Sequence, residues 1–201
     1  MAGLSAIPLL PLTIQDRTIM KLESSERLYA VFAHLVTSTL VEVVLSLVSN
    51  FLFFAISFSF TGIPWPYFPG LYGWAILCVL TTDAVNGLWG AVAPSGTVSQ
   101  LLAIPTLLFF LITAGVFPTR NAMEAAQLPV QYLSWISPFH HSIQGMLRIF
   151  EDDSGAIYEL DVIYGLELEA LLPALLINLG MWCACRAGQW WALVHLNNIS
   201  H

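Results

Sequence analysis

The amino-acid sequence predicts an all-α fold: a polytopic membrane bundle of four transmembrane helices, preceded by an amphipathic helix at the cytoplasmic surface. Of the 201 residues, 57% are apolar and only 9% are charged, whereas about 25% are charged in an ordinary soluble domain. Residues 37–59 are apolar apart from a few small polar residues and one ionisable side chain, Glu42. About 20 such residues match the hydrocarbon thickness of a bilayer, and three similar stretches follow.

Two segments precede the first of these stretches. Residues 1–13 are apolar but short and carry no basic residue, so we interpret them as a leader that is the remnant of another span rather than a signal peptide. Residues 14–29 are strongly charged, and Glu23 precedes Arg27 by four positions, a favourable helical spacing. This pattern predicts an amphipathic helix at a membrane surface.

The first two predicted spans are separated by a proline-rich turn. Span one covers residues 37–60 and ends at residues 62–67, which include two prolines, a tryptophan and a tyrosine. Such residues are typical of a turn at the membrane interface. Span two covers residues 69–92 and is followed by a tight turn at residues 93–96.

The second half of the chain contains two further spans and a polar segment between them. Span three covers residues 98–117 and includes Pro105, which predicts a kink. Residues 118–169 are too polar to span and form the predicted cap, with a short helix at residues 138–150. Span four covers residues 170–194, and residues 195–201 form a tail. Span four also carries a small-residue stripe, Gly180, Ala184 and Gly188, which allows close helix approach in lipid.

Basic residues set the predicted orientation of this multi-pass membrane protein. Three of the six precede span one and Arg186 closes span four, whereas only Arg120 and Arg148 lie in the cap. The positive-inside rule therefore places both termini in the cytoplasm and the cap on the external or lumenal side.

Three polar side chains, Glu42, Asp83 and Asn86, lie within predicted spans. A charge at membrane depth is costly, so we expect the two carboxylates to face a helix bundle or an aqueous cavity. Two interpretations stay open at this point. The carboxylates serve a substrate or proton path, or they make structural hydrogen bonds between helices.

The sequence argues against several kinds of chemistry. Lys21 is the only lysine and no Gly-x-x-x-x-Gly-Lys-Ser/Thr motif is present, so these residues cannot bind ATP through a P-loop. No basic patch suits a nucleic acid. The three cysteines lie inside spans and are interpreted as apolar fillers, and the adjacent His140 and His141 point in different directions on a helix. We predict neither a metal site nor an enzymatic activity for this chain alone.

Five short motifs follow one another along the chain. They are Glu23 with Tyr29, His34 and Glu42-Val43-Val44; Gly87 with Ala93-Pro94; Thr113 to Pro118; Leu133 to Pro138 with Gly145-Met146; and Tyr164-Gly165. In this order they resemble the membrane domain of G-type ABC transporters, the White and pleiotropic-drug-resistance group, over residues 14–191. Arg27, His34 and Val44 stand where that family has a glycine, an aromatic residue and a proline.

The resemblance implies a six-span type-2 ABC transporter membrane domain, of which this chain would hold the last four spans. Residues 14–29 would be the coupling helix, with Glu23, Arg27 and Tyr29 as its contact residues, and Glu23→Ala would uncouple transport. ATP and Mg²⁺ would bind a separate nucleotide-binding domain. A second membrane domain would complete a homo- or heterodimer.

The resemblance also implies a substrate cavity at the dimer axis, between spans one and three. Its expected apolar lining favours lipid-like or amphipathic hydrophobic substrates over ions and consists of Leu52, Phe53, Phe54, Leu107, Phe109 and Phe110. The alternative is a non-transporting four-span scaffold or assembly partner, in which the small-residue stripe and the acidic cap serve protein contacts.

Overall fold

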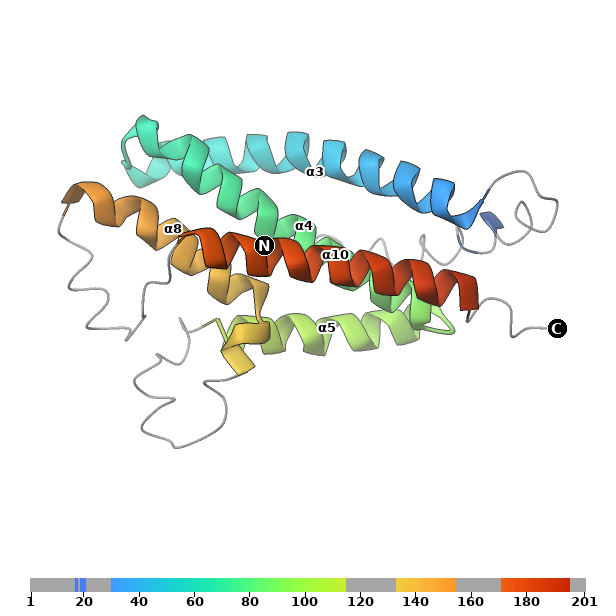
Figure 1. Ribbon diagram of the computed structural model, residues 1–201. Coiled ribbons are helices and arrows are strands. Elements are labelled where there is room, and N and C mark those ends of the chain that lie inside the picture. The colour runs from blue at the N-terminus through green and yellow to red at the C-terminus, as the bar shows by residue number, and fades with distance from the viewer. Residues whose placement is uncertain (1–16, 18, 21–29, 115–132, 155–170, 196–201) are drawn as a thin grey trace. The chain divides into compact units, whose positions relative to one another are not determined.

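The described part of the chain is helical and contains no strand, which confirms the predicted fold class (Figure 1). The computed structural model describes residues 17, 19–20, 30–114, 133–154 and 171–195.

The first long helix, α3 (Val31–Thr61), contains the span predicted at residues 37–60 and begins six residues before it. It is followed by Gly62, whose positive φ of 70° is readily adopted by glycine. The 3₁₀ helix η2 (Trp65–Tyr67) has proline in its first turn and leads into α4 (Phe68–Val92), which contains predicted span two.

Three more α-helices and one short 3₁₀ helix complete the described fold. Helix α5 (Gly96–Ile112) contains Pro105 and corresponds to predicted span three. The short helix η3 (Ser134–Ile136) precedes α8 (Pro138–Ser154), which includes the short helix predicted in the cap. Helix α10 (Leu171–His195) coincides with predicted span four to within one residue.

Among the described residues, three helical stretches are long and apolar enough to cross a membrane: Val31–Thr61, Trp65–Val92 and Leu171–His195. Helix α5 is apolar but has only 17 residues, a length of about 25 Å, at the lower end of what a span requires. The end of predicted span three, residues 115–117, lies outside the described residues. The three candidate spans and the apolar helix α5 are consistent with a helical membrane bundle.

The chain divides into two compact units, and each is described here by itself. Unit 1 comprises Met1–Asn50, Val79–Thr106 and Trp182–His201, and unit 2 comprises Phe51–Cys78 and Leu107–Met181. Of the three candidate spans, the one containing α4 is the most buried, with 56% of its apolar window inside the protein against 6% for α3 and 17% for α10. More than half of the apolar window containing α4 therefore faces protein, which suits the polar side chains that α4 carries.

Unit 2 is held together by aromatic packing and buried polar contacts. Its first part carries a cluster of rings with centroids 5.3–6.1 Å apart: Phe51, Phe54, Phe58, Trp65, Phe68 and Tyr72. The Ser137 hydroxyl donates to the Phe110 carbonyl at 2.8 Å, which ties the start of α8 to the end of α5. A close approach of Gly145 to Trp74 packs α8 against α4.

Candidate functional site

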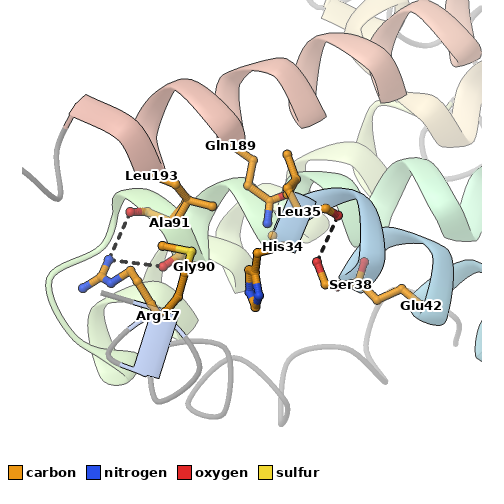
Figure 2. A pocket seen from close by; sticks show the side chains of 11 residues that line it. Arg17, His34, Leu35, Ser38, Glu42, Gly90, Ala91, Gln189 and Leu193 are labelled. Atoms are coloured by element: carbon orange, nitrogen blue, oxygen red, sulfur yellow. Dashed lines mark hydrogen bonds between the residues drawn. The ribbon is translucent and has the colours of Figure 1, made fainter. Parts of the chain in front are cut away.

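A pocket of about 70 Å³ lies in unit 1, where the N-terminal segment meets the ends of α3, α4 and α10 (Figure 2). Its polar lining residues are Arg17, His34, Ser38, Glu42 and Gln189. A polar pocket of this size holds a few water molecules.

Apolar packing fixes the N-terminal segment beside this pocket. Met20 is 2% exposed and belongs to a buried cluster with Leu35 of α3, Ala91 of α4, and Ala192 and Leu193 of α10. One methionine therefore contacts the ends of three long helices. Methionine suits such a position because its flexible side chain fills irregular gaps. Ile19, by contrast, is exposed, as expected for the apolar face of a helix at a membrane surface.

Arg17 adds a polar attachment to the same place. Its Nη1 donates to the carbonyl oxygens of Gly90, Ala91 and Ala93 at 3.4, 3.0 and 2.9 Å, and Figure 2 shows the guanidinium at the end of α4. The last turn of α4 has no basic residue of its own, and a cation stabilises the negative end of a helix. Arg17 thus caps α4 from a distant part of the chain.

The charge state of Arg17 suits this role. Burial lowers the pKa of the Arg17 guanidinium from its ordinary value, but an arginine keeps its proton at neutral pH. Its hydrogen bonds to the α4 carbonyls are therefore charge-assisted and stronger than neutral ones. In the sequence Arg17 contributed only to the predicted orientation. The sequence signal for this cap is that the last turn of α4 has no basic residue of its own.

The two carboxylates predicted at membrane depth lie on neighbouring helices of unit 1. Arg186 of α10 pairs with Glu42 of α3, with 2.5 Å between Nη2 and Oε2, and donates from Nη1 to Gln189. The Ser46 hydroxyl donates to Asp83 Oδ2 at 3.2 Å. The sequence predicts both carboxylates but not their partners, because spacing alone does not show that Arg186 of α10 meets Glu42 of α3.

Other predicted site residues are placed as follows. Glu23, Arg27 and Tyr29 lie outside the described residues. Asn86 is fully buried, and neither atom of its side-chain amide has a hydrogen-bond partner in the described part of the chain.

The six residues predicted to line a substrate cavity all lie in unit 2. Leu107 and Phe110 are buried, and Phe54 packs in the aromatic cluster. Leu52, Phe53 and Phe109 are exposed apolar residues. The predicted cavity requires a second membrane domain and stays a prediction.

The histidines in α8 have structural partners. The His141 Nε2 donates to the Trp135 carbonyl at 2.9 Å, and His140 Nδ1 lies 3.3 Å from the Ala114 carbonyl. Ser142 accepts a hydrogen bond from Asn178 of α10 at 3.1 Å. These contacts hold α8 in unit 2.

The helices and the charged cluster inside them define an integral membrane protein built as a helical bundle. Comparison with protein families is more specific, because residues 1–150 match the family described as ABC-2 type transporter. The match covers about three quarters of the chain, so the chain belongs to the ABC-2 type transporter family and is the membrane component of an ABC transporter. Such a component is not itself catalytic. No curated protein matches the chain.

Proposed function

We propose that this chain is the membrane part of an ATP-driven transporter of the G type, the White and pleiotropic-drug-resistance group, and moves lipid-like or amphipathic hydrophobic substrates. A nucleotide-binding domain, which these residues do not include, supplies ATP hydrolysis with Mg²⁺. A second membrane domain completes the transporter as a homo- or heterodimer.

The attachment of the N-terminal segment to the helix ends is the observation that carries this proposal. Arg17 caps α4, and Met20 packs against α3, α4 and α10. A displacement of this segment would therefore reach three long helices directly. A coupling helix that passes the motion of an ATP-binding domain to the spans requires such a connection.

The substrate class is supported by apolar surface in unit 2. Leu52, Phe53 and Phe109 expose large apolar side chains, and the described residues of α3 and α5 carry no charge in this unit. An apolar wall binds hydrocarbon chains or sterol rings through area burial, whereas it offers an ion no replacement for its water shell.

Transport in sealed vesicles tests the proposal. The full chain, co-expressed with its nucleotide-binding domain, is reconstituted with fluorescent phospholipid, sterol and amphipathic dye probes. We expect movement of at least one probe class with ATP and Mg²⁺, and none with a non-hydrolysable analogue. Probe movement at the same rate with and without ATP would contradict the ATP-driven mechanism. Failure of the purified chain to associate with any ATP-binding domain would favour the scaffold alternative.

A further inference from the structure

Two carboxylates and one guanidinium meet between α3, α4 and α10 of unit 1. Arg186 is engaged by Glu42, and this ion pair is neutral as a whole. Asp83 lies close enough to both residues to interact with them electrostatically. The second carboxylate is therefore left without a cation of its own.

The helices around Asp83 bring no further charge to balance it. Among the described residues, α5 has no ionisable side chain and α3 adds only His34, two turns before Glu42. Helix α10 adds two cysteines near Arg186 and His195 at its end, and the Arg17 guanidinium is bound to the α4 carbonyls. The described charged groups at this place are therefore two carboxyl groups and one permanently charged guanidinium, that of Arg186.

The position of Asp83 makes an uncompensated charge costly. It lies nine residues before the end of α4, or about 14 Å along the helix, within a candidate span. A charged side chain at membrane depth is disfavoured, and the neutral acid avoids this cost. The Ser46 hydroxyl donates to Asp83 Oδ2 and can also accept a hydrogen bond, so this contact is compatible with either protonation state of the carboxyl.

The cluster adjoins the pocket of unit 1 through Glu42. Glu42 lines that pocket, and its side chain is 43% exposed while that of Arg186 is 9% exposed. Ser46, which bonds Asp83, lies one helical turn beyond Glu42 on α3. Glu42 and Ser46 therefore lie one helical turn apart on α3, Glu42 at the pocket and Ser46 at Asp83.

We propose that Asp83 is a proton-binding site of this membrane domain, which exchanges its proton with pocket water by way of Glu42 and Ser46. Asp83 holds the proton while Glu42 engages Arg186. When a rearrangement of α3 or α10 separates that pair, Asp83 becomes the partner of Arg186 and gives its proton to the pocket water. The proposal rests on the buried cluster and not on the substrate or on ATP coupling.

Infrared spectroscopy of the full chain in lipid nanodiscs at mildly acidic pH tests this proposal. We expect a carbonyl-stretch band of a buried protonated carboxylic acid, which shifts in D₂O and disappears in Asp83→Asn. The band is also lost in Glu42→Gln, although Asp83 is present, because Arg186 then pairs with Asp83 as a carboxylate. Asp161→Asn, which removes an acid outside the apolar stretches of the sequence, leaves the band unchanged.

Three outcomes would overturn the proposal. The first is a wild-type chain without the band, a result that needs no variant to fold. The second is a band that persists at full intensity in Asp83→Asn. The third is a band that survives in Glu42→Gln, which would show that Arg186 does not control the protonation of Asp83.

Discussion

Arg186 joins two helices of unit 1 through its ion pair with Glu42. Its side chain is almost buried, and it also interacts electrostatically with Asp83. Removing one partner of a buried ion pair usually costs about 3–5 kcal/mol, because the remaining charge stays buried and unpaired. Here a second carboxylate stands beside the pair, so either carboxylate can serve Arg186 when the other is removed.

This redundancy predicts a non-additive pair of substitutions. We expect Glu42→Gln and Asp83→Asn each to destabilise the chain mildly, by about 1 kcal/mol. The double variant leaves Arg186 without a carboxylate and should cost about 3 kcal/mol more than the sum of the two. Thermal unfolding in detergent, followed by the fraction that stays monodisperse, measures the difference. Strict additivity would show that Asp83 does not replace Glu42.

At the scale of elements, glycines decide how closely the helices pack. A Cβ on Gly145 of α8 would lie 2.2 Å from the ring of Trp74 on α4, a distance that forces α8 away. On α10, a Cβ added to Gly188 would lie 3.3 Å from the side chain of Leu88 on α4, whereas a Cβ on Gly180 of the same small-residue stripe would meet open space. The stripe therefore serves a helix contact at Gly188 and none within the described structure at Gly180.

Two alanine substitutions separate these cases. Gly145→Ala should destabilise unit 2 by about 1–3 kcal/mol, the usual cost of overpacking. Gly180→Ala should be neutral or slightly stabilising, because alanine is the better helix former. Melting temperatures of the two purified variants in the same detergent check the prediction. Equal melting temperatures would contradict the tight packing of α8 on α4.

At the scale of the whole molecule, the charge pattern predicts the topology. Three of the six basic residues lie before the first span, so both termini should be cytoplasmic. We expect a glycosylation acceptor tag inserted after Gly155 to be modified in a eukaryotic host, and identical tags at Met1 and His201 to stay unmodified. Glycosidase-sensitive mobility shifts report the result. Modification of a terminal tag would show that the termini lie on the external or lumenal side, opposite to the predicted orientation.

Much of the fold follows from hydropathy, and most of the site does not. Apolar length predicted α4 and α10 to within one residue and α3 apart from its first six residues, and the cost of buried charge drew attention to Glu42 and Asp83. Arg186, the partner of Glu42, is 144 positions away in the sequence. Hydrophobic periodicity does not show which faces of two distant helices come into contact. The cap formed by Arg17 on α4 was missed for the same reason, because it joins residues more than 70 positions apart.

We propose that the N-terminal segment transmits motion to the helices through its attachment to α4. Transport per ATP hydrolysed, measured in proteoliposomes for Arg17→Ala, tests this claim most directly. Loss of hydrogen bonds from a charged group costs about 1.5–3 kcal/mol, so we expect ATP hydrolysis to continue while transport falls sharply. Arg17→Lys should restore part of the transport, and Lys21→Ala, which removes a charge from the same segment, should transport normally. Wild-type transport per ATP in Arg17→Ala would contradict the claim.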